Sequence, residues 1–276
     1  MAITKFIPEL WSSQMLVDFR EEAVFAGLTN RQYEGNLTAG NKLHIVSPVP
    51  VKVKDYKAAG RTTTADDITD TEIELVIDQE KNFDFYVDDI DRAQSAGTLD
   101  EYSRSAAHGL VDDADKHLGA LAVTNSTAVT ATVTDAESAW NVLRDLRKAL
   151  RKAKVPNQNR VFVANAEFEG LLLEYSSKIT NADTLGATEG LREAAIGRLL
   201  GFDGYVSENL PVTDKPQVVA FHRSAIAFVS QIQKTEAMRA ENKFADRLRG
   251  LHVYGSKVIR PTAVASFTAE LSLIHI

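Results

Sequence analysis

The chain has 276 residues, of which 44% are hydrophobic and 25% are charged, and its net charge is −7. The absence of cysteine excludes disulfides, thiolate nucleophiles and cysteine-based zinc sites, and the acidic balance argues against a protein that reads duplex DNA through phosphate contacts. Because no apolar run is long enough for a membrane span and residues 1–11 lack a signal-peptide pattern, we expect a soluble protein made in the cytoplasm.

The first predicted element is an amphipathic helix over residues 9–27, which Gly27 ends. Its apolar side chains recur every four positions, opposite Glu21 and Glu22, and they are Trp11, Met15, Phe19 and Ala23.

Residues 43–87 are predicted to form a long two-stranded excursion. The outgoing strand contains Pro48 and Pro50, which cannot donate to a central ladder, so it is an edge or unpaired strand. Residues 55–70 are polar and indicate an exposed tip, after which the chain returns through alternating apolar positions. Two strands with a polar tip are marginal alone in water, so we expect this excursion to rest on another subunit.

Two capping boxes predict the next helices. Thr98 and Glu101 open a helix that spans about 36 Å, long enough to serve as the backbone of an elongated domain. Thr134 and Glu137 open a second helix that stops before Pro156.

The second helix ends in a cluster of cations. Because positive charge complements the negative end of a helix dipole, a solvated helix terminus is the first interpretation, and a nucleic-acid patch is the second. The cluster comprises Arg147, Lys148, Arg151, Lys152 and Lys154.

The remaining elements alternate less regularly and give an α+β outline. Arg160 begins a short strand of the buried type, and Asn165 caps the helix that follows it. Another helix ends near Gly201. The rest is mainly strands, predicted at residues 217–221, 226–230, 251–259 and 264–268.

Asp84, Asp88, Asp89 and Asp91 form the best candidate for a metal site, because closely spaced carboxylates suit Ca²⁺ or Mg²⁺. They lack the EF-hand spacing, and their alternation with apolar residues also fits the solvated face of a strand. The six histidines show no zinc spacing, and the sequence has no G-x-S-x-G elbow and no phosphate-binding glycine loop. We therefore expect no catalytic site, cofactor or metal, and keep a metal-dependent hydrolase using Asp84–Asp91 as the alternative class.

Three segments, taken in this order, resemble the major capsid proteins of tailed bacteriophages with the HK-ninety-seven-type fold. The resemblance is to the coat-protein group common in phages of actinobacteria, and with the N-terminal helix it extends over nearly the whole chain. The segments are EIELVIDQEKNFDFYVDDIDRAQ at 72–94, GRLLGFDGYVSENLP at 197–211 and EAMRAENKFADRLRGLHVYGSKVIRP at 236–261.

The resemblance implies a division of the chain into the parts of that fold. Residues 1–42 would be an N-terminal arm and residues 43–87 an extended loop, the E-loop hairpin. Residues 88–133 and 223–276 would form a peripheral domain with a spine helix at about 97–121, and residues 134–222 an axial domain.

The resemblance also implies a function and partners. The subunit would assemble as hexamers and pentamers into an icosahedral shell that encloses double-stranded DNA, in the virion capsid, after assembly in the bacterial host cytoplasm. A separate scaffolding protein and a portal protein would be its partners, with no membrane, and an encapsulin-like nanocompartment shell is the nearest alternative. The residues expected at the subunit interface are Trp11, Lys52, Lys54, Asp55, Tyr56, Lys57, Arg61, Asp66 and Asp67.

Overall fold

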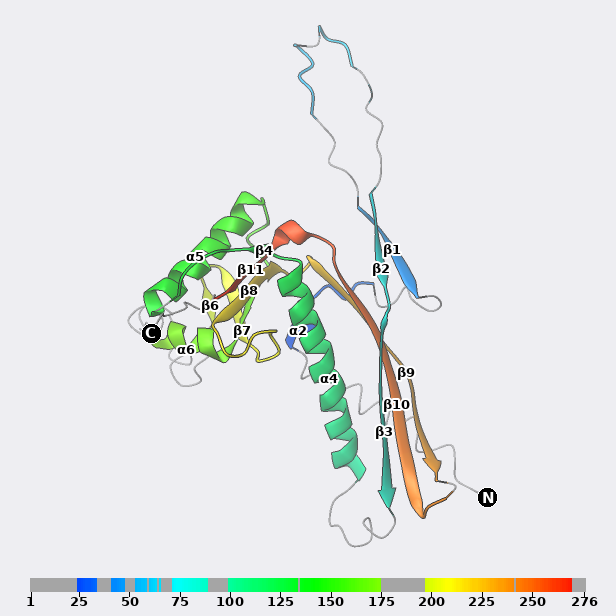
Figure 1. Ribbon diagram of the computed structural model, residues 1–276. Helices are drawn as coiled ribbons and strands as arrows, with labels where there is room; N and C mark the ends of the chain where they lie inside the picture. The colour runs from blue at the N-terminus through cyan, green and yellow to red at the C-terminus, as the bar shows by residue number, and fades with distance from the viewer. Residues whose placement is uncertain are drawn as a thin grey trace, which may run out of the picture.

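Helices and three separate sheets make up the fold in the computed structural model, which confirms the predicted α+β class (Figure 1). The structure describes residues 24–33, 41–47, 53–58, 60–63, 65, 71–88, 99–133, 135–174, 197–240 and 242–269. No helix in these ranges is both long enough and apolar enough to cross a lipid bilayer.

A six-stranded sheet forms one side of the molecule, with the strand order β4-β11-β8-β5-β7-β6. Its centre is β5, which pairs antiparallel with β8 and parallel with β7, and all five of its residues are buried. The apolar run Val161–Ala164 suits this place because both faces of the strand are covered. The strands are β4 (Thr127–Ala128), β5 (Arg160–Ala164), β6 (Arg198–Leu199), β7 (Phe202–Val206), β8 (Gln217–His222) and β11 (Val264–Thr268).

Helices α5 (Ala136–Lys152) and α6 (Ala166–Glu174) pack against this sheet. The N-cap of α5 is Asp135, whose carboxylate accepts the Ser138 backbone N–H at 2.9 Å. The cap lies one residue later than the sequence predicted, since the Asp-x-x-Ser pattern satisfies the same backbone donors. The apolar stripe of α5 is fully buried, and its members are Ala139, Val142, Leu143, Leu146 and Leu150.

A three-stranded antiparallel sheet, in the order β3-β10-β9, runs lengthwise beside α4 (Leu99–Thr124) (Figure 1). Polar contacts join the helix to the sheet: the Tyr254 hydroxyl donates to the Asp113 carboxylate at 2.7 Å, and Lys81 Nζ lies 3.3 Å from the same group. The 26 residues of α4 extend over about 39 Å. The strands are β3 (Gln79–Asp88), β9 (Ile226–Arg239) and β10 (Ala245–Val258).

The excursion leaves the body as β1 (Lys42–Ser47) paired antiparallel with β2 (Thr71–Val76). Beyond Val76 the chain continues into β3, which pairs with β10 and not with β1. The base of the excursion is anchored by Leu75, which is fully buried in a cluster with apolar side chains of β9 and β10. At the crossing point β10 carries Gly255, where a Cβ would lie 2.5 Å from the Val76 carbonyl oxygen.

Asp115 connects α4 to the short helix α2 (Val24–Leu28). Its carboxylate accepts the Val24 backbone N–H at 3.0 Å, which satisfies one of the unpaired donors at the start of α2. The side chain is buried, and this burial raises the pKa of Asp115 to about 6.

Candidate subunit interface

Large apolar side chains that remain exposed gather at two ends of the described structure. One group lies on the tip of the excursion, and the other lies at the far end of the three-stranded sheet, near the turn between β9 and β10 (Figure 1). Isolated exposed apolar residues are ordinary, but their confinement to two extremities indicates contact surfaces. The exposed fractions are 99% for Val53, 55% for Tyr56, 52% for Tyr86, 41% for Met238 and 81% for Phe244.

The tip of the excursion is a turn held by its own backbone. Asp55 Oδ1 accepts the backbone N–H groups of Lys57 and Ala58 at 2.9 and 3.2 Å, an arrangement that aspartate favours in turns. The Arg61 N–H donates to the Tyr56 carbonyl at 2.9 Å and closes the loop. The turn therefore presents the Tyr56 ring outward from a defined local structure.

Five of the nine residues expected at the interface lie in this turn: Lys54, Asp55, Tyr56, Lys57 and Arg61. All five are exposed, and three of them are cations against one carboxylate. The others, Trp11, Lys52, Asp66 and Asp67, lie outside the described residues.

At the opposite end, one row of side chains crosses the outer face of the sheet. Arg247 of β10 stands opposite Tyr86 of β3 on one side and Met238 of β9 on the other. The Arg247 guanidinium carbon lies 5.4 Å from the Tyr86 ring centre, and Lys243 Nζ lies 5.7 Å from the same centre. Both distances are in the cation–π range, so the cations hold an exposed aromatic ring in place.

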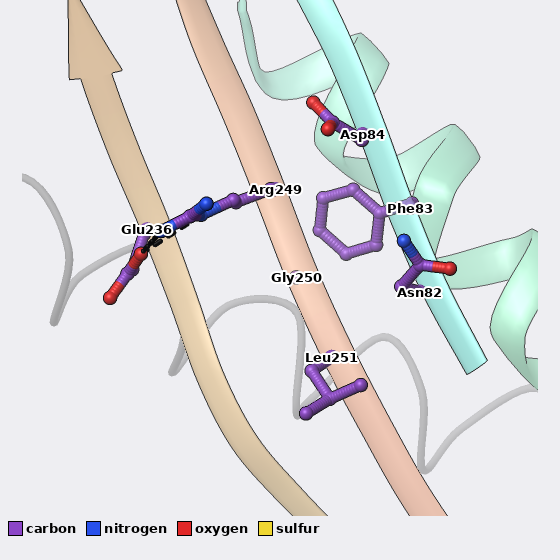
Figure 2. A pocket seen from close by; sticks show the side chains of 7 residues that line it. All are labelled: Asn82, Phe83, Asp84, Glu236, Arg249, Gly250 and Leu251. Atoms are coloured by element: carbon purple, nitrogen blue, oxygen red, sulfur yellow. Dashed lines mark hydrogen bonds and ion pairs between the residues drawn. The ribbon is translucent and has the colours of Figure 1, made fainter. Parts of the chain in front are cut away.

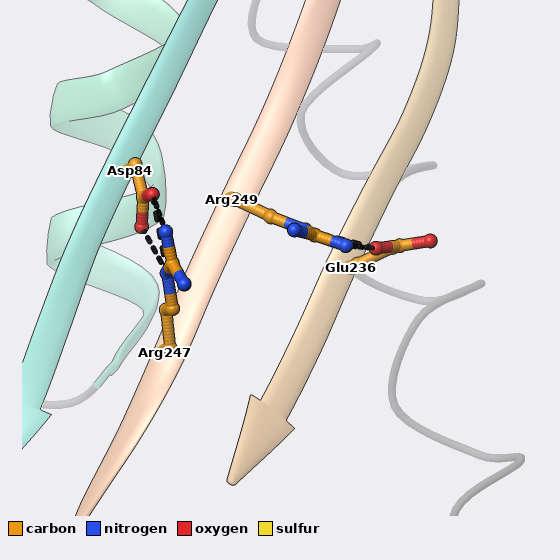
Figure 3. Close-up of polar contacts among 4 residues, drawn as sticks. All are labelled: Asp84, Glu236, Arg247 and Arg249. Carbon is orange, nitrogen blue, oxygen red and sulfur yellow. Dashed lines mark hydrogen bonds and ion pairs between the residues drawn. The ribbon is translucent and has the colours of Figure 1, made fainter. Parts of the chain in front are cut away.

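Two ion pairs continue this face (Figure 3). Arg247 donates to both carboxylate oxygens of Asp84, with Nε 2.8 Å from Oδ1, and Arg249 Nε donates to Glu236 Oε2 at 2.9 Å. The hydrogen bond from Arg247 lowers the pKa of Asp84, and the same contact raises the pKa of Arg247. Because these pairs bridge all three strands, they fix the register of a sheet end whose outer face has little apolar packing.

Beside these pairs, a hollow of about 350 Å³ opens between β3 and β9 (Figure 2). The Phe83 ring lies over Gly250, where a Cβ would approach the ring to 2.3 Å. The aromatic ring therefore fills the space that the missing side chain leaves. The residues that line the hollow are Asn82, Phe83, Asp84, Glu236, Arg249, Gly250 and Leu251.

Of the predicted acidic cluster, Asp84 is the residue whose contacts the structure describes, and they give it a structural role. Asp84 is engaged by Arg247 and lies on the solvated face of β3, as the alternative interpretation of the cluster proposed. Asp89 and Asp91 lie outside the described residues. Among the residues that the structure describes, no three His, Asp or Glu side chains are grouped so that they could hold a metal ion.

An elongated chain with a projecting hairpin and apolar side chains exposed at both ends has features expected of a subunit that packs against neighbours. The model of the phage capsid protein family matches residues 70–266. The chain belongs to this family of shell proteins, and its fold is that of HK-ninety-seven-type capsids of tailed phages.

Solved structures agree with this assignment. A structure from Mycobacterium phage Che8 is 48% identical, covers 97% of this chain and 94% of its own, and superposes with a TM-score of 0.81. The capsid structure of cyanophage P-SCSP1u is 16% identical, with coverage of 90% and 88% and a TM-score of 0.73. A virus-like particle from Pyrococcus furiosus is 13% identical, with coverage of 95% and 99% and a TM-score of 0.60. No curated protein matches the sequence.

The exposed loop tip could be predicted from the sequence because its polar residues follow one another in the chain. The exposed apolar residues at the sheet end were not predicted, although Phe244 in the polar turn Asn242-Lys243-Phe244 was an available signal. A bulky apolar residue in such a turn has no local packing reason to be there, and Phe244 is 81% exposed.

Proposed function

We propose that this protein is the major capsid subunit of a tailed phage, which assembles as hexamers and pentamers into an icosahedral shell that encloses double-stranded DNA. The observation that carries the proposal is the pair of exposed apolar ends on one elongated member of a capsid family. Two different patches on one chain suit heterologous contacts, which repeat from subunit to subunit and close into rings.

In this proposal the excursion lies across a neighbouring subunit, with the tip residues Val53 and Tyr56 buried on contact. The division into an arm (1–42), an extended loop (43–87), a peripheral domain (88–133 and 223–276) and an axial domain (134–222) is part of it. A separate scaffolding protein and a portal protein are the further partners, and assembly takes place in the bacterial host cytoplasm.

The likeness to the Pyrococcus furiosus particle supports only a shared fold, because the identity is 13%. The 48% identity to the Mycobacterium phage Che8 structure favours a phage shell over a cargo-holding compartment. Packaged nucleic acid in particles made during infection would support the phage shell, and particles that hold a cargo enzyme instead would support the compartment.

The loop's role is tested by deleting residues 55–70 and by two substitutions at Tyr56. We expect the deletion and Tyr56→Ser to give folded subunits that assemble poorly, because the tip makes no contact with the described body of its own subunit and so stabilises only the assembled state. Tyr56→Phe keeps the apolar ring and serves as the matched control. Assembly is measured by sedimentation and electron microscopy, and normal particles from the deletion would refute the loop's role.

A further inference from the structure

We infer that an exposed cationic stripe on α5 binds the phosphate backbone of DNA without reading its sequence. The stripe is defined by Arg144, Lys148, Arg151 and Lys152. The inference deepens the proposed function, on which it rests, by assigning the contact between the shell subunit and the nucleic acid that the shell encloses.

Charge is strongly segregated along this chain. Residues 144–160 contain seven Lys or Arg and one Asp, a net charge of +6. Since the whole chain carries −7, all other residues together carry −13. A polyanion is therefore repelled by the net charge of the chain and attracted to this segment.

The helix presents this charge on a single face. The buried stripe of α5 contains Leu143, Leu146 and Leu150, whereas all four stripe residues are exposed on the opposite side. At 1.5 Å per residue, the distance from Arg144 to Lys152 along the helix axis is about 12 Å. Duplex DNA carries one charge per about 1.7 Å of its axis, so several phosphates lie within reach of the stripe.

The helix dipole accounts for only half of the stripe. Arg151 and Lys152 lie in the last turn, where cations stabilise the exposed carbonyl groups, but Arg144 and Lys148 lie further back, where the dipole has little effect. Like charges four residues apart repel, and such pairs occur at 144 and 148 and again at 148 and 152.

Intramolecular partners do not relieve this repulsion. In the described parts of the chain, Lys148, Arg151 and Lys152 form no ion pair, and Arg144 reaches only its neighbour Asp145 at 3.7 Å. The adjacent Arg147 is different, because it donates to the Leu200 carbonyl at 2.5 Å and so has a structural role. A bound polyanion would remove the repulsion that the folded subunit retains.

The side chains around the stripe favour DNA over an acidic protein. Protein partners usually bury an apolar or aromatic anchor, and the exposed large apolar residues of the described chain all lie at the loop tip and the sheet end. Phosphate backbones need only point charges, which the stripe supplies. The stripe has no apolar anchor and no set of side chains arranged to hydrogen-bond base edges. Its binding to DNA is therefore expected to be independent of the base sequence.

The test compares purified full-length wild type with two double variants of equal charge, Lys148→Gln/Arg151→Gln in the stripe and Lys116→Gln/Lys257→Gln at exposed positions elsewhere. The probe is a short fluorescent DNA duplex of random sequence, titrated between about 50 and 200 mM salt. We expect the stripe variant to bind at least tenfold more weakly and to reduce the slope of log K against log salt by about 2, since each neutralised phosphate contributes about 0.9. The control variant should match wild type within about twofold.

Each of three results would overturn the inference. They are an equal loss of DNA affinity in both variants, no DNA binding by wild type, and tighter binding of poly-glutamate than of DNA by wild type. Thermal melting verifies folding, and glutamine at these positions should not lower the melting temperature because it removes like-charge repulsion. Electron microscopy of the same samples separates the two proposals. Wild-type shells that bind no DNA would end this inference alone, whereas failure to form shells would end the proposed function.

Discussion

Gly255 permits the excursion to cross β10, so replacing it with alanine should loosen the excursion at its base. A Cβ at this position would lie 2.5 Å from the Val76 carbonyl oxygen and 2.8 Å from the Ile77 Cα, both backbone atoms that cannot rotate away. The backbone φ of Gly255 is not in the left-handed region, so alanine adds no conformational strain, and the clash alone determines the effect.

The magnitude follows from the packing at the crossing. Overpacking that forces a backbone shift costs about 1–3 kcal/mol, and we expect about 2 kcal/mol for Gly255→Ala. That value corresponds to a roughly 30-fold shift in a local opening equilibrium and to a melting temperature lower by about 4–8 °C. The largest destabilisation expected is that of losing the buried contact of Leu75, whose full burial contributes about 1.5–3 kcal/mol.

Gly250→Ala in the same strand is the matched control. The three atoms nearest to its Cβ would belong to the Phe83 ring, a side chain that can rotate aside, so the cost should stay below about 1 kcal/mol. Amide hydrogen exchange measured by mass spectrometry reports the result for β2 and for β5 separately. We expect Gly255→Ala to lose protection in β2 and to keep it in β5. Equal protection of β2 in the two variants would refute the crossing argument.

Three further changes test the fold and the interface. Burial raises the pKa of Asp115 from its ordinary 3.8 to about 6. The ionised carboxylate therefore destabilises the fold by about 3 kcal/mol above pH 6, and this destabilisation decreases as the pH falls toward 4. Asp115→Asn should remove that pH dependence of the melting temperature. Burial lowers the pKa of His252 to about 4, so stability is lost as the pH falls from about 6.5 toward 4. His252→Gln should remove this loss. For Asp115 or for His252, a variant whose stability depends on pH as in wild type would contradict the role given to that residue. Phe244→Ser should leave the melting temperature within about 1 °C because the side chain is exposed, yet reduce assembly relative to Phe244→Leu, as sedimentation would measure.

The buried elements were largely predictable from sequence. The helix that stops before Pro156 and the buried type of strand that begins at Arg160 were both predicted, and the structure contains them as α5 and β5. Asn165 was identified as a helix cap, and its side chain indeed accepts the Phe168 N–H at 3.1 Å. These predictions succeed because each depends on neighbours in the sequence.

The outer halves of β9 and β10 were not predictable in the same way. Their charged residues are satisfied by partners on other strands, such as Arg249 with Glu236 and Arg247 with Asp84, which lie 13 and 163 positions apart. No local pattern reveals such pairs. The residue pattern therefore predicted strands only at 226–230 and 251–259, whereas the structure extends them to Ile226–Arg239 and Ala245–Val258.

The central claim is that an isolated subunit is incomplete and that many copies complete one another. Electron microscopy of the protein purified after co-expression with the scaffolding protein proposed above tests this most directly. We expect closed shells built from many copies, with the excursion of each subunit resting on a neighbour. A product that stays monomeric at high concentration, with residues 43–87 well ordered in the free subunit, would contradict the account.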